Sequence, residues 1–259
     1  MQSSRASSRG AESDRLREIY EQRAALEYAE PLPRPRRETH SKFFHVLDLV
    51  REHLPCESVL DAGCGDGLYL EAIGACDEAP DRIVGCDISE RILETAWATA
   101  ERSGVQPELA RANVETLPFR DEEFDLVLCT QVIEHLLDPA AGVLELARVL
   151  KPRGTLVITT DNAHNLVTRT LNAPRDVAVR ALGWRGRRLK VRFPHLSFEP
   201  AAFAALVRAA GLQPVREESF RFHLEWPLDR PLLRRGLDRL DDALPSHLVG
   251  DILTVVARK

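Results

Sequence analysis

The fold class of this chain follows from the segment Val59-Leu60-Asp61-Ala62-Gly63-Cys64-Gly65-Asp66-Gly67, in which an apolar run leads into three alternating glycines. Glycine permits a positive φ angle and lets a ligand approach the backbone closely. A helix that begins after such a loop offers free N–H groups to the ligand. Asp87 ends the next apolar run, 20 residues after Gly67, and a carboxylate there can accept two hydrogen bonds from a ribose diol. The pattern predicts a cofactor site where the first strand ends.

Short apolar runs alternate with helical patterns along the chain. The expected strands are Ser58–Ala62, Arg82–Cys86, Leu109–Ala112, Phe124–Cys129, Thr155–Thr159, Gln213–Glu218 and Ile252–Arg258. The expected helices include 41–53, 89–102, 139–150 and 200–210. Asp138 and Pro139 are a helix-start signal, Lys151-Pro152-Arg153-Gly154 is expected to stop that helix, and Gly211 is a C-terminal signal. This alternation is typical of an α/β fold, a Rossmann-like and mostly parallel sheet with helices on both faces.

The domain organisation follows from length and local composition. The chain has 259 residues, and its alternating part fits one α/β domain over 40–259. Residues 1–11 are rich in Ser and Arg without an apolar pattern, so we expect a disordered tail. Residues 12–39 are expected to form a helix followed by a proline-rich linker. Residues 161–198 are long for a simple connection and are expected to be a substrate-side insertion after the fifth strand.

Composition excludes several classes of protein. Hydrophobic residues make up 44% and charged residues 29% of the chain, as in ordinary globular proteins. No apolar stretch approaches the ~20 residues that span a bilayer, and Met1–Gly10 lacks the apolar core of a secretory signal. The five cysteines form no C-x-x-C pair, which argues against a disulfide framework or a cysteine zinc site. We therefore expect a cytoplasmic protein.

The net charge of −5 is unevenly distributed. Residues 61–160 carry 8 basic and 19 acidic side chains, whereas 161–259 carry 17 and 11. The segment 165–192 alone has eight basic residues and one acid, with apolar residues between them. Three interpretations stay open: a solvated lid, an amphipathic surface for peripheral contact with anionic membrane, and a patch for an anionic substrate. The acidic total argues against a nucleic-acid partner, and nothing in the sequence indicates the oligomeric state.

Two classes of cofactor fit a glycine loop of this kind. Dinucleotides need room for a pyrophosphate, and their usual pattern is G-x-G-x-x-G. Here the spacing is G-x-G-x-G, and Asp61 stands before the first glycine. A carboxylate at that place would repel a pyrophosphate but suits an ammonium group. A nicotinamide-dependent dehydrogenase is therefore the weaker interpretation, as is a plain strand-to-helix turn.

At this point the sequence resembles the class I S-adenosylmethionine-dependent methyltransferases, in the broad group that includes quinone-biosynthesis O-methyltransferases. The resemblance covers roughly residues 40–259. The segments that carry it are Val59–Gly67, Asp87, Asn113-Val114-Glu115-Thr116-Leu117-Pro118-Phe119, Phe124-Asp125-Leu126-Val127, Glu134-His135-Leu136 and Leu150-Lys151-Pro152-Arg153-Gly154. The resemblance implies a strand order of 3-2-1-4-5-7-6 with the seventh strand antiparallel, an N-terminal cap helix, and S-adenosyl-L-methionine as the cofactor.

The resemblance also implies contacts to that cofactor. Asp61 would orient its ammonium group, and Asp87 would bind the ribose hydroxyls. Asn113 stands where the family usually has an aspartate, and its amide oxygen can still accept from the adenine amino group. The other contacts would be the methionine cradle of Gly63, Gly65 and Gly67, the adenine contacts of Ile88 and Val114, and Thr130 and Gln131 beside the sulfonium.

The expected reaction is methyl transfer to a small-molecule or lipid-like acceptor, at oxygen in the first place, with nitrogen and carbon acceptors left open. An RNA methyltransferase and a non-catalytic protein that binds S-adenosylmethionine are the alternatives. In-line methyl transfer requires mainly that the protein orient the acceptor toward the methyl group. If the acceptor atom carries a proton, a general base that removes it speeds the reaction. Three histidines are candidate catalytic groups: His135 after the fourth strand, His164 after the fifth, and His195 in an H-x-x-F segment like that of relatives.

A metal site is not expected. Some members of the family bind a divalent metal through an E-x-x-E-H motif, and this chain has Gln131-Val132-Ile133-Glu134-His135 in its place. An amide in place of the first carboxylate removes a charge and a strong ligand for a hard cation.

Overall fold

The computed structural model describes residues 10, 13–22, 41–164, 195–220 and 250–259. The predicted tail, the proline-rich linker and the basic segment 165–192 lie outside the described residues, apart from position 10 of the tail. Residues 13–22 are helical, which agrees with the start of the helix expected in 12–39. No helix in the described part of the chain is both long and apolar enough to cross a bilayer.

Strands and helices alternate as the sequence predicts. In chain order they are α3 (Ser41–Arg51), β1 (Ser58–Ala62), α4 (Leu68–Gly74), β2 (Arg82–Asp87), α5 (Glu90–Glu101), β3 (Glu108–Arg111), β4 (Phe124–Thr130), the 3-10 turn η1 (Ile133–His135), α6 (Pro139–Val149), β5 (Leu150–Asp161), α8 (Pro200–Ala209), β6 (Gln213–Phe220) and β7 (Ile252–Arg258). Every strand predicted from an apolar run is present, two of them with the predicted bounds.

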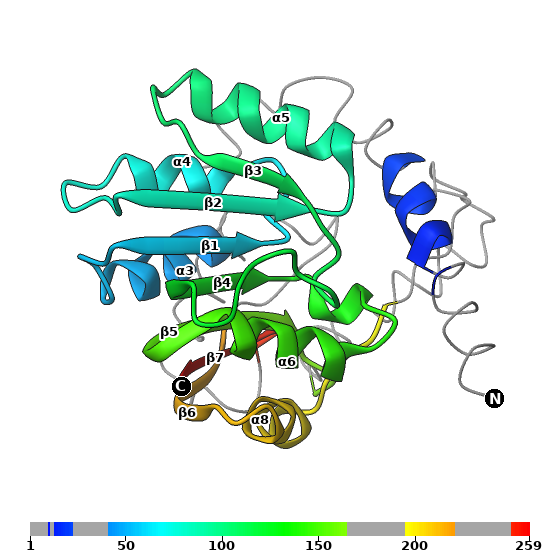
Figure 1. The fold of residues 1–259 in the computed structure, drawn as a ribbon. Helices are drawn as coiled ribbons and strands as arrows, with labels where there is room; N and C mark the ends of the chain where they lie inside the picture. The colour runs from blue at the N-terminus through cyan, green and yellow to red at the C-terminus, as the bar shows by residue number, and fades with distance from the viewer. Residues whose placement is uncertain (1–9, 11–12, 23–40, 165–194, 221–249) are drawn as a thin grey trace, which may run out of the picture.

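The seven strands form one sheet in the order β3-β2-β1-β4-β5-β7-β6 (Figure 1). Strands β1 to β5 pair in parallel, and β7 runs antiparallel to both of its neighbours. This confirms the fold class and the strand order that the resemblance implies. Because the parallel strands point the same way, their carboxyl ends meet at one edge, next to the helix over 13–22 (Figure 1).

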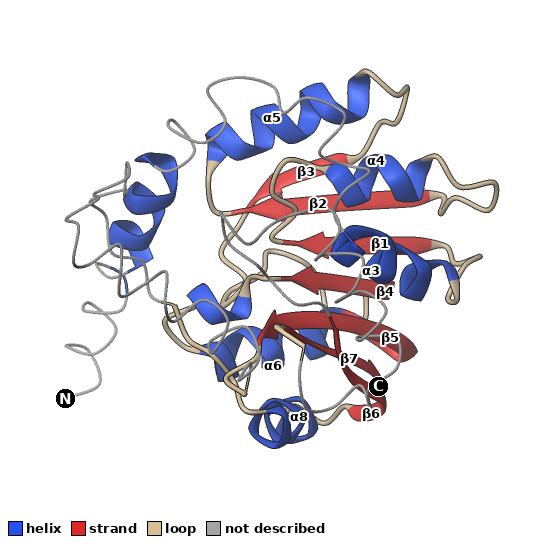
Figure 2. Ribbon diagram, turned by 180° about the vertical axis from the view of Figure 1, so that it is seen from behind, coloured by secondary structure: helices blue, strands red, loops and turns tan. Residues whose placement is uncertain are grey.

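Helices cover both faces of the sheet, and Figure 2 shows α3 and α4 in front with α6 behind. The strands supply both layers because neighbouring side chains point to opposite faces. In β1, Val59 packs with α3, α4 and α5, while Leu60 packs with α6 and α8. Both side chains are fully buried. Burial on both faces explains why the central strands read as continuous apolar runs.

The helix signals in the sequence have physical counterparts. The Asp138 side chain accepts a hydrogen bond from the Ala141 N–H at 3.2 Å, and Pro139 occupies the first helical position of α6. Gly211 has a φ of +83° and follows Ala210, the C-cap residue of α8. The prediction that residues 151–154 stop this helix is wrong. Helix α6 already ends at Val149, and residues 151–154 belong to β5.

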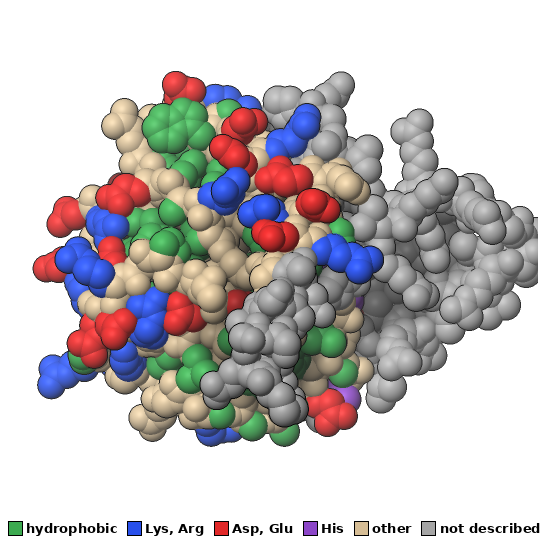
Figure 3. Space-filling model, turned by 45° about the vertical axis from the view of Figure 1, so that its right-hand side comes forward, with side chains coloured by type: hydrophobic (Ala, Val, Ile, Leu, Met, Phe, Trp, Pro, Cys, Tyr) green, Lys and Arg blue, Asp and Glu red, His purple; other side chains and the backbone are tan. Residues whose placement is uncertain are grey.

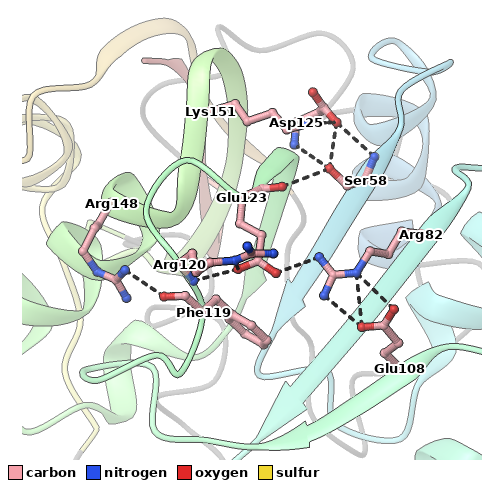
Figure 4. A network of polar contacts seen from close by, with 9 residues as sticks. All are labelled: Ser58, Arg82, Glu108, Phe119, Arg120, Glu123, Asp125, Arg148 and Lys151. Atoms are coloured by element: carbon pink, nitrogen blue, oxygen red, sulfur yellow. Dashed lines mark hydrogen bonds and ion pairs between the residues drawn. The ribbon is translucent and has the colours of Figure 1, made fainter.

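The amino ends of the strands are joined by ion pairs (Figure 4). Arg82 binds both carboxylate oxygens of Glu108 and also reaches Glu123 at 2.8 Å. Lys151 binds Asp125 at 2.8 Å, and Asp125 accepts from the hydroxyl of Ser58 at 2.7 Å. These bonds connect β1, β2, β3, β4 and β5, so they hold the sheet together at the edge away from the glycine loop.

Charges on the described surface are mixed. Figure 3 shows acidic and basic side chains lying side by side over the described part of one face. The acidic excess of residues 61–160 therefore does not form a single-sign field on that face. Unlike these surface acids, the buried acids Asp61 and Glu134 lie inside the molecule, at the carboxyl edge of the sheet.

Candidate functional site

A pocket of about 520 Å³ lies at the carboxyl ends of the parallel strands. Its walls come from the segments that follow β1, β2, β3, β4 and β5, together with α3 and the helix over 13–22. The crevice beyond the carboxyl ends of the strands is the usual ligand site of an open α/β sheet.

Most of the predicted site residues line this pocket. They are Gly63, Gly65, Asp87, Ile88, Asn113, Val114, Thr130, Gln131, His135 and His195. Three do not line it: Asp61 is buried beside it, Gly67 is the N-cap residue of α4, and His164 is exposed on the surface.

The glycine loop combines an open side with a packed side. A Cβ added at Gly65 would meet nothing within 4 Å, and this glycine lines the pocket. A Cβ at Gly67 would come within 2.9 Å of the Ala96 backbone, so this glycine lets the loop pack against α5. Both have a positive φ, which favours glycine over any other residue. The loop thus places its backbone against the pocket and against α5 at once.

Asp87 is held in a fixed orientation at the end of β2. Its carboxylate accepts from the N–H of Gly65 at 3.2 Å and from the N–H of Ser89 at 3.0 Å. Burial raises the pKa of Asp87, and the backbone donors oppose that rise. A carboxylate that is fixed and lines a pocket is suited to accept further hydrogen bonds from a ligand, as a ribose diol would offer.

Asp61 is a fully buried acid at the end of β1. Neither of its carboxylate oxygens has a partner among the described residues. Burial, and then the negative charges of Asp87 and Asp66, raise its pKa to about 8. A buried polar group with no partner is costly, so it calls for a specific explanation. A cationic ligand in the adjoining pocket would supply the missing charge.

The helix over 13–22 is bonded to the pocket walls. Glu21 accepts from the hydroxyl of Ser89 at 3.0 Å and from the N–H of Glu90 at 2.7 Å. The amide of Asn113 donates to the hydroxyl of Ser13 at 3.2 Å, and its oxygen accepts from the N–H of Glu115 at 3.0 Å. An amide oxygen has two lone pairs, so Asn113 keeps one acceptor site for a ligand. The helix therefore closes one side of the pocket.

Gln131 occupies an unusual place at the end of β4. Its φ of 57° lies in the left-handed region, which costs energy for a residue with a side chain. Its backbone N–H is bonded to Thr159, and its side-chain nitrogen is buried without a partner among the described residues. A strained residue with a spare donor at a pocket wall is typical of a ligand contact.

Histidines and carboxylates gather at one side of the pocket. The rings of His135 and His195 have centroids 5.2 Å apart, and Tyr20 lies edge-on to His135 at 6.1 Å. Nε2 of His195 lies 2.8 Å from a carboxylate oxygen of Asp161. Burial, and then the charge of Asp161, raise the pKa of the nearby Glu134 to about 7, although Thr160 donates to it at 3.1 Å.

His164 lies apart from this group. Its side chain is 49% exposed and 3.6 Å from Glu199, outside the pocket. Sequence reasoning did not single out Asp161, Lys42 or Phe43, which do line the pocket. Asp161 follows the apolar run of the fifth strand, so its place at a carboxyl end was available as a signal. Lys42 and Phe43 come from α3, where no motif marks them.

The described residues contain no group of three or more His, Cys, Asp or Glu side chains that could hold a metal ion.

Comparison with known proteins gives a consistent picture. Residues 60–158 match a family model described as a methyltransferase domain. The ubiquinone biosynthesis O-methyltransferase of Hahella chejuensis is 36% identical over 119 residues, which are 45% of this chain and 49% of that protein. Its counterpart from Dinoroseobacter shibae is 30% identical over 186 residues, 67% of this chain and 68% of that protein. The chain spans about half to two thirds of the length of these curated relatives.

Solved structures share the fold. An S-adenosylmethionine-dependent methyltransferase from Mesorhizobium loti superposes with a TM-score of 0.58 at 19% identity, covering 83% of this chain and 97% of that one. The cyclase SpnF superposes with a TM-score of 0.57 at 20% identity, covering 83% of this chain and 80% of its own. Since one of these proteins is named a methyltransferase and the other a cyclase, the structural similarity establishes the architecture alone.

Proposed function

The chain belongs to the class I S-adenosylmethionine-dependent methyltransferases, and from this we propose that it transfers the methyl group of S-adenosylmethionine to a hydroxyl oxygen of a small, lipid-like acceptor. The observation that carries the proposal is the buried Asp61 carboxylate, which has no partner among the described residues. S-adenosylmethionine carries an ammonium group and a sulfonium, both cationic. A pyrophosphate cofactor would bring further negative charge beside Asp61, Asp66 and Asp87.

The residues fit the cofactor in the following roles. Asp61 neutralises the ammonium group, Asp87 binds the ribose hydroxyls, and Asn113 accepts from the adenine amino group. The remaining roles are a methionine cradle of Gly63, Gly65 and Gly67, adenine contacts by Ile88 and Val114, and contacts near the sulfonium by Thr130 and Gln131. The strained Gln131 and the open side of Gly65 support these assignments.

The bound cofactor supplies an electrophilic methyl group. The protein holds the acceptor in line with that group, excludes water and receives the proton of the acceptor. His135 and His195 line the pocket and are proposed for these tasks. We assign no catalytic role to His164, because its side chain lies outside the pocket.

A lipid-like oxygen acceptor is supported by two observations. The curated relatives carry the name ubiquinone biosynthesis O-methyltransferase. The rings of Tyr20, Phe43, His135 and His195 line the pocket. The two aromatic rings offer flat apolar faces, and the two imidazoles next to them can accept or donate a proton.

We also propose that the protein works in the cytoplasm and contacts anionic membrane through residues 165–192. Eight basic residues with interleaved apolar ones support this proposal from the sequence alone. Pelleting with phosphatidylglycerol-containing vesicles at graded salt tests it. We expect binding that weakens with salt, and no binding at low salt would refute the membrane contact.

Calorimetry tests the cofactor assignment without knowledge of the acceptor. We expect binding of S-adenosylmethionine and S-adenosylhomocysteine and none of NAD, with a loss of about tenfold or more in Asp87→Ala, which removes the ribose acceptor. Unchanged affinity in that variant would contradict the assignment. Transfer of a deuterated methyl group to catechol and to a geranylated catechol, followed by mass spectrometry, then tests the acceptor class.

A further inference from the structure

We infer that Asp161 is a positioning residue, which orients His195 so that this imidazole takes the proton of the acceptor hydroxyl. The inference rests on the proposed function, since it concerns the acceptor side of the same pocket. Asp161 ends β5, and His195 lies beyond the residues that the structure leaves undescribed. The two side chains meet at the pocket, with Nε2 of His195 2.8 Å from Oδ2 of Asp161.

The backbone fixes the segment that carries His195. The Leu196 N–H donates to the Glu134 carbonyl at 2.9 Å, and the Phe198 N–H donates to the Asp161 carbonyl at 2.9 Å. The Ala163 N–H returns a bond to the Phe198 carbonyl, also at 2.9 Å. Segment 195–198 is therefore bonded to the end of β5 and to η1. His195 is held in place by main-chain bonds that do not depend on its own side chain.

The surroundings of the ring leave it open toward the pocket. The His195 side chain is 52% exposed and Asp161 is 31% exposed, so both are at the rim rather than in the core. Among the described residues that line the same pocket, the titratable groups near this pair include His135 and Glu134 of η1 and Lys42 of α3. The ring of His135, at 5.2 Å, limits how far the His195 ring can turn.

The contact to Asp161 decides which ring nitrogen can act as a base. Because Nε2 lies 2.8 Å from a carboxylate oxygen of Asp161, we assign the proton of the neutral ring to Nε2, and Nδ1 keeps its lone pair. In the step, the acceptor hydroxyl gives its proton to Nδ1 while its oxygen forms a bond to the methyl carbon. The carbon–sulfur bond breaks, and its electron pair returns to sulfur to give S-adenosylhomocysteine. The imidazolium that results is balanced by the charge of Asp161.

Another pair of the same kind provides a matched control. His45 of α3 binds Glu218 of β6 at 2.6 Å, and neither lines the pocket. Both pairs join a histidine to a carboxylate between segments distant in sequence. If Asp161 acted only by stabilising the fold, loss of either pair should lower the activity to a similar extent.

The first test needs neither cofactor nor acceptor. In protein labelled with ¹⁵N-histidine, NMR should show a protected Nε2–H proton on His195 in the wild type, which is lost in Asp161→Ala. The backbone spectrum should stay close to that of the wild type, since Asp161 is near the surface. An unchanged Nε2–H signal in the variant would overturn the orienting contact.

The second test is kinetic, with deuterated methyl transfer to a geranylated catechol. His195→Gln should lower kcat about 100-fold or more, and Asp161→Asn about 10- to 100-fold, with the KM for S-adenosylmethionine unchanged. The double variant should be no slower than His195→Gln, because Asp161 acts through His195. Free imidazole should restore part of the rate in His195→Gly, and Asp161→Glu should retain more activity than Asp161→Asn. His45→Asn should keep the wild-type kcat.

The outcomes separate the inference from the proposed function. Full activity in both Asp161→Asn and His195→Gln overturns the inference while methyl transfer stands. Absence of S-adenosylmethionine binding or of any methyl transfer refutes the proposed function, and the NMR result then shows only whether the orienting contact exists.

Discussion

The pKa values of acids at the two edges of the sheet are shifted in opposite directions. At the amino edge, the Arg82 guanidinium lowers the pKa of Glu108, and Lys151 and Ser58 lower that of Asp125 against the effect of its partial burial (Figure 4). At the carboxyl edge, burial raises the pKa of Asp61 to about 8 and that of Glu134 to about 7. The residue types are the same, and Asp125 and Asp61 lie on the neighbouring strands β4 and β1.

The difference separates the part that stabilises the fold from the part that binds. Acids at the amino edge have partners within the protein and need nothing more. At the carboxyl edge, Asp61 is kept from water with no hydrogen-bond partner among the described residues, at a cost in stability that a cationic ligand can remove. Unfavourable electrostatics inside a stable scaffold thus mark the site independently of any motif.

The largest expected effect is on the ligand-free protein. At pH 7, Asp61→Asn should raise the free energy of unfolding by a few kcal/mol, because one pKa unit corresponds to about 1.4 kcal/mol and the unfolded value is about 3.9. Since the folded pKa is raised, the penalty is absent below the unfolded value, grows as the pH rises to about 8 and is constant above it. Urea unfolding at pH 5, 7 and 8.5 measures this. A gain that does not increase between pH 5 and pH 8 would contradict it.

The same substitution should weaken the binding of S-adenosylmethionine about 10- to 100-fold, as expected for loss of a hydrogen bond to a charged group. Binding to the wild type at pH 7 should release protons, because the ammonium group favours the ionised form of Asp61. Calorimetry in two buffers of different ionisation enthalpy measures both quantities. Glu108→Gln, at the other edge, should bind like the wild type. Equal proton release in wild type and Asp61→Asn would exclude Asp61 as the linked group.

Much of this architecture could be predicted from the sequence, because burial on both faces makes the central strands continuous apolar runs. The glycine loop and Asp87 also follow from local residues, since the turn and the strand end are specified within a few positions. Lys42 and Phe43 could not be placed in the same way, because no motif marks them in α3. Their importance arises from segments that meet only in the folded sheet. Nor could sequence distinguish His195 from His164, because the separation depends on backbone bonds of segment 195–198 to η1 and β5.

Arg82→Ala should affect stability without affecting the site. Arg82 pairs with Glu108 and Glu123 and lies 5.2 Å over the Phe124 ring, so its loss leaves Glu123, within the described part of the chain, with only the more distant guanidinium of Arg120 at 4.0 Å. Because Arg82 is about one third exposed, solvent screening limits the cost to about 1–2 kcal/mol. Thermal unfolding should show a fall of a few degrees, while the Kd for S-adenosylmethionine stays within twofold of the wild type. If the Kd for S-adenosylmethionine rose so much that the loss of binding free energy exceeded the loss of unfolding free energy, the amino edge would contribute to the site as well as to stability.

The smallest effect is expected for Lys151→Met, which removes the partner of Asp125 at 2.8 Å but keeps the apolar stem of the side chain. Both side chains are about 30% exposed, so the cost at pH 7 should be about 0.5–1 kcal/mol. Because the folded pKa of Asp125 is lowered, this contribution is present above the unfolded value of about 3.9 and is lost as the pH falls below it. Urea midpoints should therefore differ at pH 7 and converge toward pH 3, which is opposite to the trend at Asp61, where lower pH relieves a penalty. A difference that persists unchanged at pH 3 would show that Lys151 acts through packing rather than charge.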